Sequence, residues 1–331
     1  MSGVAFAGPT AGGSSDSDVL SLSGIPAVQP QNTGSVDGAG VPAASKEAVR
    51  DSQPLTLDDA GGGGIIVHGF FEYPFKTAYI TPRGLVVENK GLVMQPVGGL
   101  VFPIDMPAGS AFTDTAFIAG IWNSINTHQD DHFIGAYNEV DFFATLSTKV
   151  ASNLSLSVTY VPFLSPPHNF SVEHNIEFAV SYDDSKMLGD FALHPYTKVF
   201  WAVESQSSTV ITGKAGRTFD VEIGMVPGYT YKGITNYPIT LQAPIFVTIG
   251  PAEYWGFDEK PSNFGTFSAG VTASIPLSFI PKRWGNWHAD AGFTYYNLIN
   301  KNLRLAAFLA TNGSTSDENQ YVGSVGVGLN F

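Results

Sequence analysis

The most constraining feature of this sequence is a period-two alternation of apolar and polar residues, which recurs from about Phe71 to the last residue. In residues 266–279, every second residue from Phe267 to Phe279 is apolar, and Pro276 is the one apolar break between them. Because side chains of a β-strand point alternately to its two faces, the pattern predicts strands with one apolar face. Similar apolar rows run through residues 140–146, 176–182, 219–225, 239–249, 287–295 and 321–331.

Composition indicates what surrounds the apolar face. Asp, Glu, Lys and Arg make up 14% of the chain, against roughly 25% in ordinary soluble domains, while the apolar share is 44% and the mean hydropathy is +0.07. In a soluble β-sandwich or soluble barrel the polar face meets water, where Lys and Glu are common. Here that face carries mainly Ser, Thr, Gly and Asn, which favours a confined lumen with the apolar face in lipid. No stretch of 18 apolar residues exists, which excludes an α-helical membrane protein.

The strand count and the loop lengths predict the architecture. About twelve strands, within a range of ten to fourteen, are centred near residues 79, 97, 119, 144, 159, 178, 200, 224, 244, 272, 292 and 326. Long connections at 123–136, 205–216, 251–264 and 297–320 alternate with short ones at 151–153 and 281–286, although 103–114 and 183–193 are longer than this pattern predicts. The sequence therefore predicts an all-β fold, a transmembrane antiparallel up-and-down β-barrel over residues 65–331.

Two local features refine this prediction. Pro96, Pro162, Pro227 and Pro244 fall within or near the predicted strands, and because proline removes a ladder donor, we expect them at rims or bulges. Residues 301–310 predict a short helix in the last long connection, either a lid or an element packed against the rim.

Residues 1–64 differ from the rest and predict a flexible, acidic N-terminal extension. They are rich in Gly, Ser, Ala and Pro, contain one aromatic residue, and hold seven acids against two bases. Such a segment buries too little apolar area to offset its ordering entropy. Ala5-Phe6-Ala7 has the small-x-small form of a signal-peptidase site, without a full leader before it. The tail is expected in the periplasm, and residues 8–64 either dock a periplasmic partner or neighbouring subunit or form an unstructured spacer.

The last strand resembles the C-terminal strand of Gram-negative outer-membrane barrels, which typically end in Phe. Its residues Val-Gly-Val-Gly-Leu-Asn-Phe331 alternate, and Tyr321, Leu329 and Phe331 form the expected assembly signal. The resemblance implies insertion by the outer-membrane assembly machinery and a location in the outer membrane, in contact with its lipid. Assembly into a homo-oligomer is left open.

Three blocks in the first half of the predicted barrel are similar to the TorF-like porins: residues 78–84 (AYITPRG), 120–124 (GIWNS) and 137–141 (YNEVD). The chain departs from that family at Thr81-Pro82, where a Val-Phe-type pair usually precedes Arg-Gly, and in its long tail. The family has no firmly defined solute, so the resemblance implies a channel and names no substrate.

Charged residues on the face opposite the apolar rows are the candidate lumen lining. They are Glu139, Asp141, Lys149, Glu177, Lys198, Glu204, Asp220, Glu222, His288 and Asp290. Seven acids against two lysines predict a negative lumen that favours cations or neutral polar solutes. The alternative is a hydrogen-bonded plug in which the acids pair with Lys149, Lys198 and Arg217 and keep a small barrel closed. Twelve strands permit either state.

Several other chemistries are excluded or have weak support. A net charge of −13 gives no electrostatic basis for nucleic-acid binding, and without cysteine there is no thiol chemistry or Cys-zinc site. No cofactor is predicted. His288 and Asp290 lie two residues apart on one face, but no recognisable nucleophile motif accompanies them. The densest metal-ligand cluster is His128, Asp130, Asp131 and His132 in a predicted outer loop, where solvated loop residues are the simpler interpretation.

The sequence therefore predicts a non-enzymatic, porin-like channel for passive diffusion of small polar or cationic solutes. Two alternatives remain open: a structural or assembly barrel whose tail docks a partner, and a barrel hydrolase.

Overall fold

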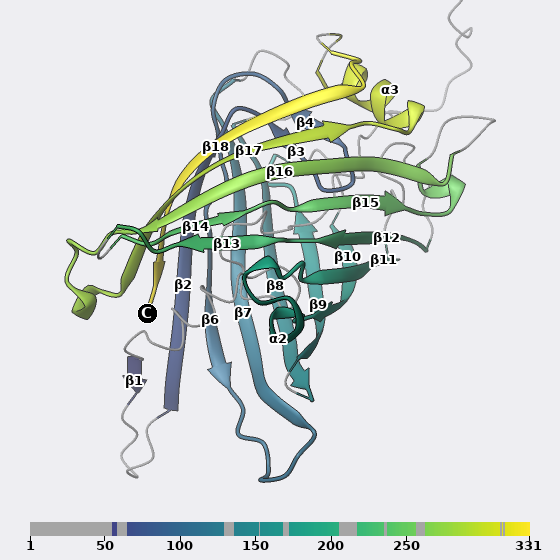
Figure 1. Ribbon diagram of the computed structural model, residues 1–331. Coiled ribbons are helices and arrows are strands. Elements are labelled where there is room, and N and C mark those ends of the chain that lie inside the picture. Colours follow the sequence, from purple (N-terminus) through teal and green to yellow (C-terminus); the bar gives the residue numbers. More distant parts are fainter. Residues whose placement is uncertain are drawn as a thin grey trace, which may run out of the picture.

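The computed structural model describes residues 55–57, 65–128, 136–151, 153–167, 172–204, 217–234, 237–255, 262–311, 313 and 315–331. Within these ranges the chain forms one closed antiparallel β-barrel of twelve strands (Figure 1), as the sequence predicts. None of the helices in the described ranges is long and apolar enough to cross a membrane.

Nine barrel strands are continuous and three consist of two pieces. The continuous strands are β2 (Ile65–Lys76), β7 (Phe112–Asn126), β8 (Tyr137–Val150), β9 (Leu154–Leu164), β10 (Glu173–Tyr182), β11 (Pro195–Glu204), β16 (Phe264–Pro276), β17 (Asn286–Asn297) and β18 (Asn319–Asn330). The divided ones are β5 (Val93–Met94) with β6 (Val97–Pro103), β12 (Thr218–Met225) with β13 (Gly228–Tyr231), and β14 (Ile239–Gln242) with β15 (Ile245–Ile249). Pairing of β18 with β2 closes the ring.

Short elements complete the fold. They are strands β1 (Leu55–Leu57), β3 (Tyr79–Ile80) and β4 (Val86–Glu88), helices α2 (Ser185–Leu188) and α3 (Lys301–Ala310), and 3-10 helices η1 (Gly189–Phe191), η2 (Ala252–Tyr254) and η3 (Lys282–Trp284). β1 lies within the range predicted as a tail and pairs with the start of β2. Residues 1–54 and 58–64 lie outside the described residues. α3 has the bounds that the sequence predicts.

The prolines account for the divided strands. Pro96, Pro227 and Pro244 each stand between the two pieces of a divided strand. Pro162 lies within β9, where the pairing of β8 with β9 skips from Asp141–Phe163 to Ala144–Tyr160. Because proline has no N–H to donate, the ladder is interrupted where it would otherwise need that donor.

Burial is inverted relative to a soluble barrel. Each of the twelve strands exposes at least one large apolar side chain, for example Phe142 and Val271, each about half exposed. The alternate positions carry buried polar side chains, among them Thr145, Ser157 and Ser268. An apolar exterior around a polar interior is the arrangement of a barrel in lipid, since lipid does not hydrate polar groups and the closed ladder satisfies the backbone.

The two ends of the barrel differ. Strands β2, β7, β9, β11, β15 and β17 end at the α3 end, where residues 77–92 and α3 lie. Strands β6, β8, β10, β13 and β16 end at the opposite end, here called the turn end, whose connections include 104–111, 183–194 and 277–285. Figure 1 shows α3 at one end of the barrel and β1 near the other.

Residues 77–92 fill the α3 end of the barrel instead of forming its first strand. The sequence predicts a strand centred near residue 79, but the first barrel strand is β2, and β3 and β4 form a small hairpin beyond it. The turn of this hairpin contains Gly84, whose φ is +88° and where an added Cβ atom would lie 2.9 Å from the Cβ of Thr266. The apolar residues here are buried against inward-facing side chains, so their pattern does not mark a lipid-facing strand.

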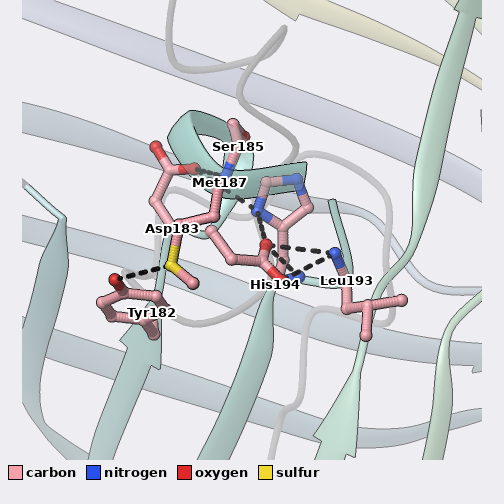
Figure 2. Close-up of polar contacts among 7 residues, drawn as sticks. Tyr182, Asp183, Ser185, Met187, Leu193 and His194 are labelled. Carbon is pink, nitrogen blue, oxygen red and sulfur yellow. Dashed lines mark hydrogen bonds and ion pairs between the residues drawn. The ribbon is translucent and has the colours of Figure 1, made fainter. Parts of the chain in front are cut away.

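Backbone hydrogen bonds to two aspartates hold the connection between β10 and β11, residues 183–194. Asp184 accepts hydrogen bonds of 3.0 Å from the backbone amides of Leu193 and His194, and Asp183 accepts one of 3.0 Å from the amide of Ser185 (Figure 2). Burial alone would raise the pKa of Asp184, but the amides of His194 and Leu193 hold it below the usual value. The connection is therefore an ordered turn that depends on an ionised aspartate.

Replacing Asp184 by alanine is expected to lower the free energy of unfolding by about 1–3 kcal/mol, because two amides lose their acceptor. A depressed pKa stabilises the fold above the unfolded pKa of about 3.9 and ceases to do so as the pH falls through the folded pKa. The loss of unfolding free energy in Asp184→Ala is thus largest at neutral pH and becomes smaller in acid. Denaturant unfolding of the wild type and the variant, at neutral pH and in acid, measures this loss. Asp105→Ala, at an exposed position of another turn-end connection, is the control, and an equal effect there would contradict the assignment.

Candidate functional site

The predicted lumen residues lie mostly on inward-facing positions of the strands. Glu139, Asp141, Glu177, Lys198, Asp220 and Glu222 are buried, and His288 and Asp290 lie together on β17 with side chains mostly covered. Lys149 lies instead near the turn end, where its ammonium is 3.1 Å from the carboxylate of Asp114 and both side chains are partly exposed. Glu204 ends β11, and its side chain lies outside the described residues.

Arg83 connects the inserted segment 77–92 to the barrel wall. Its Nη1 donates a 3.0 Å hydrogen bond to the hydroxyl of Tyr254 and lies 3.9 Å from the Oδ1 of Asp220. The guanidinium carbon lies 3.7 Å from the ring centroid of Phe200, which is a cation–π geometry. Arg83 therefore contacts β11, β12 and η2 at once.

Tyr79 forms the second connection of this segment to the wall. Its hydroxyl donates a 3.0 Å hydrogen bond to the Oε2 of Glu139 on β8. Its ring lies against Trp122 of β7, with centroids 5.6 Å apart. The side chains of Glu139 and Asp141, two residues apart on β8, are both fully buried. Segment 77–92 thus covers acidic groups that sequence analysis assigns to the lumen face, where an open channel and a closed plug are both possible.

Glu222 is held by neighbours on the adjacent strand. The hydroxyl of Tyr196 donates a 2.7 Å hydrogen bond to its Oε1, and Lys198 lies directly opposite Glu222 in the pairing of β11 with β12. The Lys198 ammonium is 5.6 Å from the centroid of the Tyr196 ring. Lys198 partly offsets the charge of Glu222, so Glu222 attracts a passing cation less strongly than an isolated carboxylate does.

A second polar cluster lies between β2 and β17 and contains Glu72, which sequence analysis missed. His288 Nε2 is 3.2 Å from the Glu72 carboxylate and 3.3 Å from the Oδ2 of Asp290. The sequence does contain a signal for Glu72, because Phe71, Tyr73 and Phe75 alternate with Glu72 and Lys76. The prediction placed the first strand near residue 79 and therefore did not include this alternating segment.

Carboxylates outnumber bases among the buried groups of the barrel strands. In the described barrel strands the buried acids are Glu72, Glu139, Asp141, Glu173, Glu177, Asp220 and Glu222. The buried bases are Lys76 and Lys198, with Arg83 added from the inserted segment. The interior is therefore acid-rich and partly neutralised, so it carries features of both the channel and the plug interpretations.

The outer-loop metal candidate is described only in part. His128 Nδ1 lies 3.5 Å from the Oε2 of Glu88, a residue of β4. Asp130, Asp131 and His132 lie outside the described residues, so their relation to His128 stays a prediction.

Two residues of the expected assembly signal, Tyr321 and Leu329, lie on the closing strand β18, and Phe331 directly follows it. Tyr321 points outward and packs against Phe293 and Tyr295 of β17, with ring centroids 6.0 and 5.5 Å away. Leu329 pairs with Trp287 on one side and Phe71 on the other. The backbone of Phe331 exchanges two hydrogen bonds with Gly69 in β2. Recognition by an assembly machinery remains a prediction.

Comparisons with known proteins find similarity of structure only. No protein-family model and no curated protein matches the chain, so no sequence match supports the resemblance to the TorF-like porins. Among solved structures it is similar to the NanC porin, with a TM-score of 0.41 and 10% identity over 79% of this chain and 98% of that one. An outer membrane channel from Pseudomonas putida F1 gives a TM-score of 0.41 and 9% identity over 83% of this chain and 100% of that one. The beta domain of the Bordetella autotransporter Brka gives a TM-score of 0.41 and 10% identity over 80% of this chain and 100% of that one. The fold assignment rests on the strand pairing, and no function is transferred from these structures.

Proposed function

We propose that this protein is an outer-membrane, porin-like channel for passive diffusion of small polar or cationic solutes. The observation that carries the proposal is the combination of an apolar exterior on all twelve strands with an acid-rich polar interior. A closed barrel with this burial belongs in a bilayer, and a lumen with excess carboxylates raises the local concentration of cations. The α3 end faces the cell exterior in this proposal, and residues 1–64 lie in the periplasm.

The proposed channel is narrowed by its own first connection. Segment 77–92 is anchored by Arg83 and Tyr79 to strands on several sides of the barrel. Solutes therefore pass beside this segment or when it shifts, which predicts a small conductance compared with wide general porins. The resemblance of residues 78–84 to the TorF-like porins falls on this segment.

A catalytic role has less support. In a hydrolase with a serine or cysteine nucleophile the active nitrogen of a histidine faces the nucleophilic hydroxyl or thiol, whereas Nε2 of His288 faces the carboxylates of Glu72 and Asp290. We therefore assign no reaction to this cluster.

Single-channel recording in a planar bilayer tests the proposal. We expect small, stable steps with a reversal potential that favours cations in a salt gradient. Neutralising Glu139, Asp141 and Glu222 together, as Glu→Gln and Asp→Asn, is expected to reduce this preference, because these carboxylates supply part of the lumen charge. Asp105→Asn, at an exposed turn-end position, is the control for loss of a carboxylate outside the lumen. A correctly folded wild-type barrel that stays silent would reject the channel and leave the structural-barrel alternative.

A further inference from the structure

The strongest unassigned feature of the interior is the cluster of Glu72, His288 and Asp290. One ligand atom from each residue can be chosen so that all three lie within 4.8 Å of one another. Glu72 is almost completely buried, and His288 and Asp290 are largely covered, so the cluster is not a solvated group of surface acids. The residues come from β2 and β17, strands separated by 216 positions in the sequence at the Glu72–His288 contact.

Strand pairing builds this cluster around a glycine. Gly328 of β18 pairs with Glu72 on one side and with His288 on the other. A Cβ atom at Gly328 would lie 2.1 Å from Glu72 Oε2 and 2.3 Å from His288 Nε2. Only the absence of a side chain on the middle strand lets the carboxylate and the imidazole meet across it. Asp290 follows two residues after His288 on the same face of β17.

The hydrogen bonding inside the cluster is incomplete. Both Glu72 oxygens and the Oδ2 of Asp290 converge on the single atom Nε2 of His288, at 3.2–3.3 Å. One N–H can serve only one of these oxygens well. Within the described part of the chain, Glu72 Oε1 and Asp290 Oδ2 accept no hydrogen bond. Buried carboxylate oxygens without donors are costly, and a cation at their focus removes that cost.

The spacing suits a small transition-metal ion. Zinc bonds to His nitrogen and carboxylate oxygen are about 2.0–2.2 Å, so two ligand atoms of a tetrahedral site lie about 3.3 Å apart. The observed N–O separations are 3.2 and 3.3 Å. One imidazole with two carboxylates is a ligand set used for Zn²⁺ and similar divalent ions, whereas Ca²⁺ and Mg²⁺ prefer oxygen alone.

We propose that Glu72, His288 and Asp290 form a binding site for one divalent transition-metal ion, of the Zn²⁺ type, in the wall of the barrel lumen. The site is independent of the outer-loop cluster around His128. It does not require that the barrel conducts, so its test is separate from the test of the channel.

Metal titration of the full-length folded protein tests the site. The protein is stripped with a chelator in detergent micelles, and ZnCl₂ binding is measured by calorimetry, with CoCl₂ absorption as a second probe of ligand geometry. We expect one strong Zn²⁺ ion per chain that His288→Asn and Asp290→Asn each weaken roughly tenfold or more. Glu72→Gln keeps the shape of the side chain and is expected to weaken binding similarly.

Two further variants separate ligation from general effects. Gly328→Ala removes no ligand but occupies the space between Glu72 and His288, so it is expected to abolish strong binding. Glu177→Gln, at another buried lumen carboxylate, and His128→Gln, at the outer-loop pair, are expected to leave the affinity unchanged. Circular dichroism confirms that each variant is folded. Absence of strong Zn²⁺ binding in the wild type, or binding that survives both His288→Asn and Asp290→Asn, would overturn the proposal.

Discussion

Replacing Arg83 by alanine is expected to loosen segment 77–92 and to raise the single-channel conductance several-fold. Arg83 is the one residue of this segment that contacts Tyr254, Asp220 and Phe200 together among the described contacts. Removing one partner of a buried charge pair is strongly unfavourable, by about 3–5 kcal/mol in comparable cases, because it leaves the other charge uncompensated. The hydrogen bonds between the barrel strands do not involve Arg83, so we expect segment 77–92, and not the barrel wall, to loosen in this variant.

Three comparisons sharpen this experiment. Arg83→Lys keeps the charge but loses the planar stacking on Phe200, so an intermediate conductance is expected. Arg83→Ala combined with Asp220→Asn removes both charges and is expected to recover part of the lost stability. Arg304→Ala breaks an exposed pair with Glu318 at the same end of the barrel, which is expected to change stability by less than about 1 kcal/mol. If Arg83→Ala and Arg304→Ala have the same conductance as the wild type, segment 77–92 does not restrict the lumen.

Introducing arginine on the outer face of the barrel is expected to destabilise it according to depth. Val271 lies near the middle of β16 and is about half exposed, so Val271→Arg is expected to cost about 2–4 kcal/mol in a bilayer. Phe279 is more exposed but lies in the turn-end connection 277–285, where an arginine is expected to cost about 0–1 kcal/mol. The difference follows from the absence of water around the middle of the strands.

Unfolding in phospholipid vesicles measures this difference. Tryptophan fluorescence follows denaturant unfolding of the wild type, Val271→Arg and Phe279→Arg under identical conditions. A soluble barrel would accept an arginine at either exposed position with little change. Equal stability of the two variants would therefore show that the apolar exterior does not lie in lipid.

The barrel itself was predictable from local pattern because each strand carries its own evidence. The alternation in residues 266–279 and in the other rows indicates strands, and the low charge of the second face indicates a lumen. The helix at Lys301–Ala310 and the interruptions at Pro96, Pro227 and Pro244 were also local properties. The outward direction of the apolar rows follows from the same composition, because lipid rather than water surrounds the strands.

The contents of the lumen were not predictable from local pattern. Apolar residues such as Tyr79 and Val86 have the composition of a strand, but they are buried inside the ring because the surrounding strands present Trp122, Phe200 and neighbouring groups to them. The local sequence pattern of a connection does not indicate whether that connection folds into the barrel lumen or outside the barrel. The pairing of Lys149 with Asp114 near the turn end depends on the register of β7 against β8.

The all-β class, a count of about twelve strands and the apolar exterior followed from the sequence, because these depend on residues close together in the chain and on the solvent around them. Only the tertiary structure decided that Arg83 reaches Asp220 and that Glu72 meets His288 across Gly328. Those contacts join positions far apart in the sequence, and they exist because closing the ring fixes the register of each strand against its neighbours.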